Sequence, residues 1–142
     1  MKIRKTTKKD WKRCKEVIYA CIEQVNIIPK MKKFLRKRYT LEGIEKLSKK
    51  ADMFVFEKSG NVQASGMLIK HEIGMIYVYP KYQRQKIGTM MVVGIEKFAK
   101  QKGLKRVYVK ALLPAVDFYE KLGYKKTRKK DKEHYKMEKK LK

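Results

Sequence analysis

The sequence predicts a mixed fold of the α/β (or α+β) class, in which helices pack against a central β-sheet. Helical patterns of apolar residues over 11–25 and 87–98 alternate with short runs rich in β-branched and aromatic residues, the clearest at 53–56 and 72–79. The chain has 142 residues, of which 43% are hydrophobic and 37% charged. That composition can close a core, and without repeats or a linker we expect one domain over 1–142.

The first fifty residues are predicted to hold a short strand and then helices. The apolar row of the first helix is Trp11, Cys14, Val17, Ile18, Cys21, Ile22 and Val25. Thr7 and Asp10 have the spacing of a capping box before this helix, which should end before Pro29. Residues 30–39 are predicted as a short helix or an ordered loop, and Thr40 should cap the next short helix. Residues 2–6 are compatible with the strand.

A β-hairpin is predicted next. Residues 53–56 and 62–69 form two strand patterns around a turn at 58–61, and a third strand is expected over 72–79. Gly66 lies inside the second strand, where a glycine indicates a bulge or a close approach of another part of the backbone.

The remaining elements alternate between helix and strand. A helix should begin at Ile87 and end at Gly103, a residue suited to a helix C-terminus. A strand follows over 106–109, and Pro114 stands where another helix would begin. Residues 124–127 and 135–137 are predicted as a closing pair of strands.

The charge is strongly positive, with 39 Lys and Arg against 14 Asp and Glu and a formal net charge of +25. Such a field attracts nucleic acid and other polyanions, but the basic residues are spread along the whole chain, so nucleic acid is expected only through generic charge. The sequence has no apolar run of about 20 residues and no secretory signal, so we expect a cytoplasmic protein that does not enter a membrane. Cys14 and Cys21 lie about 10 Å apart along one helix, and are expected to be core residues without a metal.

The stretch from Tyr77 to Met91 predicts a strand that stops at Pro80, a polar loop and the start of a helix. The first turn of a helix carries unpaired N–H groups and a partial positive charge, which favour a phosphate. The loop is not a Walker loop, because it lacks the Gly-Lys-Ser/Thr order. Nor is it a dinucleotide fingerprint, because it holds one glycine.

Gln83-Arg84-Gln85-Lys86-Ile87-Gly88 resembles the pyrophosphate loop of the Gcn5-related N-acetyltransferase (GNAT) superfamily, with Lys86 where that family has its first glycine. A second segment, Ala115-Val116-Asp117-Phe118-Tyr119-Glu120-Lys121-Leu122-Gly123-Tyr124, resembles the family's later helix and strand start. The resemblance covers roughly 52–140 and is most specific over 72–124. Leu112 replaces an asparagine often found three positions before Ala115.

The resemblance implies a mostly antiparallel sheet of six to seven strands flanked by about four helices. It also implies an N-acetyltransferase that moves an acetyl group from acetyl-CoA (coenzyme A) to a primary amine by direct attack, without a metal. The implied cofactor-binding residues are Ile76, Tyr77, Val78, Gln83, Arg84, Gln85, Lys86, Ile87, Gly88, Thr89, Phe118 and Lys121. Acceptor specificity would lie in 26–50 and 124–140, and the protein would be a monomer or a homodimer.

Two residues are implied as catalytic. Tyr119 would protonate the departing CoA thiolate, and it also fits as a core residue of an amphipathic helix. Glu72 stands where the histone-acetylating branch keeps its base, although a water relay could take the proton instead. Two other functions are compatible with the sequence: a basic nucleic-acid- or ribosome-associated protein, and a non-catalytic acyl-CoA-binding regulator.

Overall fold

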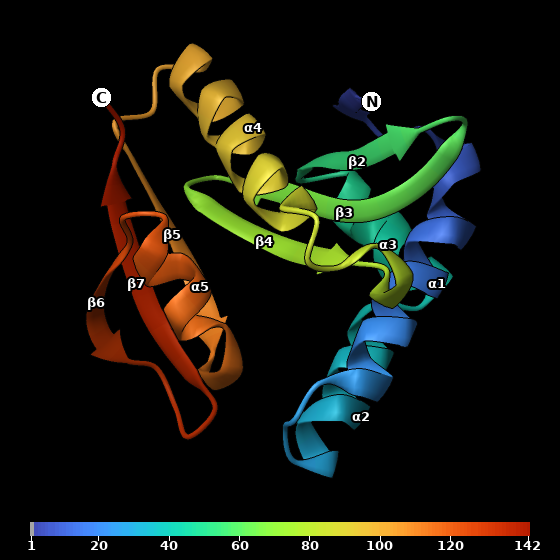
Figure 1. Cartoon of the computed structure of the whole chain (residues 1–142), viewed down its shortest axis with the longest axis horizontal. Helices are drawn as coiled ribbons and strands as arrows, with labels where there is room; N and C mark the ends of the chain where they lie inside the picture. Colours follow the sequence, from blue (N-terminus) through green and yellow to red (C-terminus); the bar gives the residue numbers. More distant parts are fainter. Residues whose placement is uncertain (1) are drawn as a thin grey trace.

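The computed structural model describes residues 2–142, and one seven-stranded sheet runs through it (Figure 1). The strand order is β1-β2-β3-β4-β5-β7-β6. The strands are β1 (Lys2–Lys5), β2 (Asp52–Lys58), β3 (Asn61–Ile69), β4 (Glu72–Val78), β5 (Arg106–Leu112), β6 (Lys125–Lys129) and β7 (His134–Lys140). All neighbours are antiparallel except β4 and β5. The predicted mixed, mostly antiparallel sheet is therefore confirmed.

Five α-helices flank the sheet, where about four were expected. They are α1 (Trp11–Gln24), α2 (Pro29–Arg38), α3 (Leu41–Ser48), α4 (Ile87–Gln101) and α5 (Val116–Lys121). Residues 30–39, predicted as a short helix or a loop, form the helix α2, whose first residue is Pro29. Proline is well tolerated there because its missing N–H would have no partner in the first turn.

The core forms on both faces of the sheet. On one face, α4 and α5 bury residues such as Met91, Ile95 and Val116 against the strands. On the other, α1, α2 and α3 bury residues such as Ile18, Leu35 and Ile44. Within residues 2–142, no helix has the length and apolar character needed to cross a bilayer.

Local capping follows the sequence at both predicted positions. Thr7 and Asp10 form a capping box around the short 3₁₀ turn η1 (Lys8–Asp10) that precedes α1. The Thr40 hydroxyl accepts a hydrogen bond from the Gly43 N–H at the start of α3. Each side-chain oxygen satisfies a backbone donor that the helix itself leaves unpaired.

Strands β4 and β5 diverge, and the pocket described below lies at this divergence. Glu72 and Tyr108 are the one residue pair that joins them, whereas β3 and β4 pair along their length. Beyond that pair the backbone of β4 has no neighbouring strand on its β5 side within the described residues. Figure 1 shows the two strands separating toward the end of β4.

A bulge bends β4 between its two halves. The register shifts opposite Gly66, and Met75 adopts a positive φ of 56°. The Ser65 hydroxyl donates a hydrogen bond of 2.8 Å to the Met75 carbonyl, which holds the bulge. A Cβ on Gly66 would lie 2.7 Å from the Ile95 Cδ1, so α4 packs directly on this point. Gly66 therefore faces the predicted bulge, and the atoms that approach it closely belong to side chains rather than to the backbone.

Candidate active site

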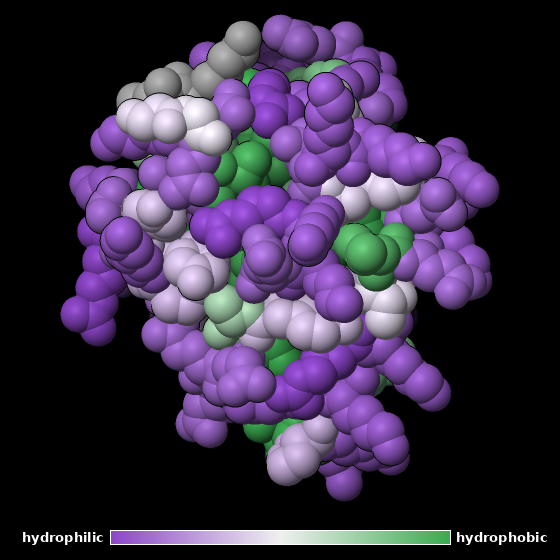
Figure 2. Space-filling model, turned by 90° about the vertical axis from the view of Figure 1, so that its right-hand side faces the viewer, coloured by the Kyte–Doolittle hydropathy of each residue, from purple (hydrophilic) through white to green (hydrophobic). Residues whose placement is uncertain are grey.

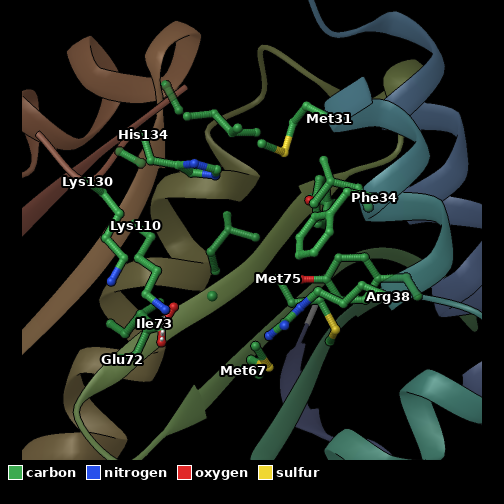
Figure 3. Close-up of a pocket in the computed structure, with 18 of the residues that line it drawn as sticks. Met31, Phe34, Arg38, Met67, Glu72, Ile73, Met75, Lys110, Lys130 and His134 are labelled. Carbon is green, nitrogen blue, oxygen red and sulfur yellow. Dashed lines mark ion pairs between the residues drawn. The ribbon is translucent and has the colours of Figure 1, made fainter. Parts of the chain in front are cut away.

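A pocket of about 430 Å³ opens where β4 and β5 diverge (Figure 3). Its floor is formed by β4 and β5, one wall by α2, and the opposite wall by the loop between β6 and β7. The lining residues are Met31, Phe34, Leu35, Arg38, Tyr39, Met67, Glu72, Ile73, Gly74, Met75, Ile76, Tyr77, Lys110, Ala111, Leu112, Ala115, Tyr119, Lys130, Asp131 and His134. The walls thus come from segments within 26–50 and 124–140, the two ranges expected to bind the acceptor.

Glu72 lies in this pocket at the first position of β4. Its side chain is 16% exposed, and the Lys110 ammonium lies 3.7 Å from its Oε1. The Tyr108 hydroxyl is 3.5 Å from the same oxygen, at the limit of a hydrogen bond. Figure 3 shows Lys110 extending toward the Glu72 carboxylate. The carboxylate is thus held by two neighbours on β5 while it remains open to the cavity.

Tyr119 reaches the pocket from α5. The residue is 8% exposed, and its ring packs edge-on against Phe118 and Tyr124, with ring centres 4.9 and 5.5 Å apart. Burial raises the pKa of its phenol above the usual value, so the hydroxyl keeps its proton at neutral pH. Within residues 2–142, its hydroxyl makes no hydrogen bond. The ring is a core residue and the hydroxyl a free proton donor, so the two interpretations of Tyr119 are compatible.

The polar loop lies at the end of β4, just after the short turn η2 (Pro80–Tyr82). The Gln83 amide donates a hydrogen bond of 2.9 Å to the Val78 carbonyl, which ties the loop to the strand. Arg84 and Lys86 adopt positive φ angles of 66° and 65°. Lys86 therefore takes the left-handed conformation for which glycine is the usual residue. Helix α4 starts at the next residue, and the lysine side chain offers no acceptor to its first N–H groups.

Gly88 connects this loop to α5. A Cβ at position 88 would lie 3.3 Å from the Phe118 ring and 3.7 Å from the Val78 Cγ2. The first turn of α4 can therefore press against Phe118 because residue 88 has no side chain. The two sequence segments that were singled out separately are in direct contact.

The structure brings part of the predicted site residues into one cavity. Glu72, Ile76, Tyr77 and Tyr119 line the pocket. The remaining predicted residues lie outside its lining, at the end of β4, in the loop before α4, at the start of α4 and on α5: Val78, Gln83, Arg84, Gln85, Lys86, Ile87, Gly88, Thr89, Phe118 and Lys121. A long, narrow ligand would be needed to contact both groups.

Several pocket residues were not predicted individually. Arg38, Lys110, Lys130 and His134 supply its polar walls, while Met31 and Phe34 supply an apolar one. In a sequence with 39 basic residues, no single lysine or arginine is conspicuous. These residues are identified by their position in the same cavity as Glu72 and Tyr119.

The cysteines are buried, as predicted. Cys14 is fully enclosed in α1, and the Cys21 thiol donates to the Val78 carbonyl at 3.0 Å. Burial raises the pKa of Cys14 to about 12 and that of Cys21 to about 11. Residues 2–142 contain no cluster of three or more His, Cys, Asp or Glu that could hold a metal.

Comparison with known proteins gives a consistent result. The model of the acetyltransferase (GNAT) family matches residues 22–124. A GCN5-related N-acetyltransferase from Rhodopseudomonas palustris has a TM-score of 0.90 at 20% identity, over 99% of this chain and 95% of that one.

Two further structures contain the coenzyme. The PaiA N-acetyltransferase of Thermoplasma acidophilum, in complex with coenzyme A, has a TM-score of 0.81 at 20% identity over 98% of each chain. A GNAT family acetyltransferase of Elizabethkingia anophelis with acetyl-CoA bound has a TM-score of 0.63 at 19% identity, over 72% of this chain and 84% of that one. The family model covers more than half of the chain, and the fold agrees throughout. The chain therefore belongs to the GNAT family of acetyltransferases.

Proposed function

We propose that this protein transfers the acetyl group of acetyl-CoA to a primary amine by direct attack of the amine nitrogen. The observation that carries the proposal is that a carboxylate, Glu72, and a protonated phenol, Tyr119, line one cavity at the divergence of β4 and β5. One group can accept a proton and the other can donate one, which is the pair of functions that this reaction needs.

The co-substrate would lie along the diverging strand. The backbone from Ile76 to Val78 has no β5 neighbour within the described residues. Those of its groups that β3 and the side chains of Gln83 and Cys21 leave unpaired can bond to the amide groups of a pantetheine arm. The pyrophosphate would then meet the loop from Gln83 to Thr89 and the N-terminus of α4. The exposed side chains of Arg84 and Lys86 would supply positive charge there. Phe118 on α5 lies against Gly88, and Lys121 on the same helix would add a further charge. Lys86 adopts the left-handed conformation that glycine favours, which supports a working loop over a disabled one.

The proton balance assigns a separate step to each side chain. An alkylamine of pKa about 10.4 is almost fully protonated at pH 7, so it must first lose a proton, which Glu72 accepts directly or through water. The neutral nitrogen attacks the thioester carbon, the C–S bond breaks, and the nitrogen loses its second proton. Tyr119 gives its proton to the departing sulfur and recovers one from solvent. One proton is released overall.

Acetyl-CoA binding is the first test. A ligand at 100 times its dissociation constant stabilises the folded state by about 2.7 kcal/mol. We expect acetyl-CoA to raise the melting temperature, and an amine panel to cause release of free CoA. If millimolar acetyl-CoA leaves the melting temperature unchanged, the proposal is wrong.

Substitution of the two pocket residues tests their functions separately. Tyr119→Phe should lower kcat by about 10²- to 10⁴-fold and leave the thermal shift with acetyl-CoA intact, because the ring packing is kept. Glu72→Gln should lower kcat at neutral pH and recover as the pH approaches the pKa of the amine, where the amine no longer needs a base. A Glu72→Gln enzyme with an unchanged pH profile would assign the proton to water.

A further inference from the structure

The walls of the pocket carry an excess of positive charge. Three cationic side chains line it, Arg38, Lys110 and Lys130, against two carboxylates, Glu72 and Asp131. The two carboxylates do not neutralise all three cations. Glu72 is approached by Lys110 at 3.7 Å, and Asp131 lies 3.0 Å from the His134 ring and accepts the Glu133 N–H. Within residues 2–142, Arg38 and Lys130 have no carboxylate within ion-pair distance.

Arg38 is held at the pocket without being neutralised. It is the last residue of α2, and its guanidinium lies 5.6 Å from the ring centre of the buried Tyr39. Burial raises the pKa of Tyr39 and Tyr77, and the charge of Arg38 acts against that rise at both hydroxyls. Figure 3 shows Arg38 extending from α2 into the pocket, toward the side from which Lys110 extends. A guanidinium has five N–H donors, so a side-chain hydrogen bond from Arg38 to Tyr39 leaves other donors for an anion.

An apolar surface adjoins these charges. Phe34 and Met31 lie one and two turns before Arg38 on the same helix wall, and Met67 and Met75 also line the pocket. Phe34 is 57% exposed and lines the pocket, so its ring is accessible to an apolar group there. Methionine side chains adapt to apolar groups of different shape. The pocket thus offers an apolar contact next to a guanidinium that has no carboxylate partner within the described residues.

We propose that the acceptor is a small primary amine that carries a carboxylate and an apolar side group, with Arg38 binding the carboxylate. This rests on the proposed acetyltransferase function and names its substrate class. A guanidinium binds a carboxylate through two parallel hydrogen bonds, and a cavity of about 430 Å³ suits a molecule the size of an amino acid. The same excess of positive charge disfavours an acceptor with several amino groups.

The test compares acceptors that differ in one charge. Leucine, methionine and phenylalanine are each assayed against their amides with acetyl-CoA, and kcat/KM is measured by CoA release. Amidation lowers the pKa of the α-amine, so the amides are the better nucleophiles at neutral pH. We expect a preference of at least about tenfold for the free carboxylates, because a charge-assisted contact is worth more than about 1.4 kcal/mol.

Two variants of α2 locate the effect. Arg38→Gln should lower the ratio of kcat/KM for each amino acid to that for its amide to about one or below, mainly by raising KM for the amino acid. Lys37→Gln removes the same charge from the exposed neighbouring position, which does not line the pocket, and should keep the wild-type ratio. Arg38 is exposed, so both variants should melt within a few degrees of the wild type and give the same shift with acetyl-CoA.

Three results would overturn the acceptor class: amides used as well as the carboxylates, an Arg38→Gln enzyme that keeps the preference, or acetylation of no member of either set. If another amine still releases CoA, the acetyltransferase function stands and the acceptor proposal alone is wrong. If the protein does not bind acetyl-CoA and no amine causes release of CoA, the proposed function itself is wrong.

Discussion

Lys86 occupies a backbone conformation that costs an ordinary residue energy. Its φ of 65° lies in the left-handed region, where a residue with a Cβ is less stable than glycine by roughly 1–2 kcal/mol. Arg84, two residues earlier, has a φ of 66°, so two cationic residues of this short loop adopt the left-handed conformation. Both side chains are exposed at the end of β4, where the pyrophosphate is proposed to bind. The strained backbone therefore coincides with concentrated positive charge.

Replacing Lys86 separates these two effects. Lys86→Gly removes the left-handed strain but gives the unfolded chain more freedom, so we expect a gain in stability of up to about 1 kcal/mol. The same change removes the ammonium, so the thermal shift caused by acetyl-CoA should become smaller. Both quantities come from melting curves with and without ligand.

Lys86→Ala is the control for that variant. It removes the ammonium and keeps a Cβ in the left-handed conformation, so it should lose affinity without the gain in stability. If the glycine variant binds acetyl-CoA as tightly as the wild type, the side chain of Lys86 does not contact the cofactor.

At the scale of elements, a small charged network joins the start of the chain to the sheet. The Arg4 guanidinium on β1 donates to both carboxylate oxygens of Asp10, at 2.9 and 3.0 Å, and also bonds to Glu57 on β2. Asp10 further accepts the Thr7 N–H at 2.7 Å. One carboxylate thus fixes η1, the start of α1 and the edge strand β1.

Asp10→Asn should cost about 1–3 kcal/mol in the free energy of unfolding at pH 7, because the half-buried Arg4 loses one of its two carboxylate partners. The hydrogen bonds from Arg4 lower the pKa of Asp10 below its usual value. The carboxylate therefore stabilises the fold above the unfolded pKa of about 3.9, and this contribution is lost as the pH falls through the lower folded pKa. Urea unfolding at pH 7 and pH 3 should show the cost shrinking in acid.

Glu16→Gln is the matched control, since Glu16 makes an exposed ion pair of 3.7 Å with Arg13 in the same part of the chain. It should change stability by less than about 0.5 kcal/mol at either pH. An Asp10→Asn cost that is equal at pH 3 and pH 7 would contradict the assignment of the effect to charge.

The elements differ in how far they can be predicted from sequence. Thr7, Thr40 and Gly66 could be interpreted locally, because a cap or a close approach depends on a few neighbouring residues. The bulge at Met75 carries no comparable signal, since its positive φ is imposed by pairing with β3. The insertion of β7 between β5 and β6 depends on pairing between distant segments. For the same reason Arg38 and Lys110 could not be placed in one cavity before the fold was known.

At the scale of the whole molecule, the core is vulnerable to alkali. It encloses the thiols of Cys14 and Cys21, and burial raises the pKa of both. A group whose folded pKa is raised stabilises the fold fully below its unfolded pKa. That stability is lost as the pH rises from the unfolded to the folded value.

Cys14→Ala isolates this effect from the general change in net charge. The wild type should be more stable at pH 7, and its advantage should shrink by about 1.4 kcal/mol per pH unit above about pH 9, toward the folded pKa of about 12. Urea unfolding between pH 7 and 10.5 measures the difference. Cys21→Ala should begin to change at the same pH and level off earlier, since the Cys21 pKa is about 11. A difference that stays constant with pH would contradict the buried-thiol explanation.

The surface as a whole is dominated by charge, and Figure 2 shows a face on which hydrophilic side chains surround small apolar patches. The outermost strand, β6, is an extreme case, because each of its residues is exposed and four of the five are basic. A free sheet edge can add a strand from another molecule and so seed aggregates. Here any second copy that approaches in the same way brings the same charges, and the two edges repel each other. Salt or a polyanion would weaken that repulsion, so the solubility of the protein should depend on ionic strength through this one strand more than through the rest of the sheet.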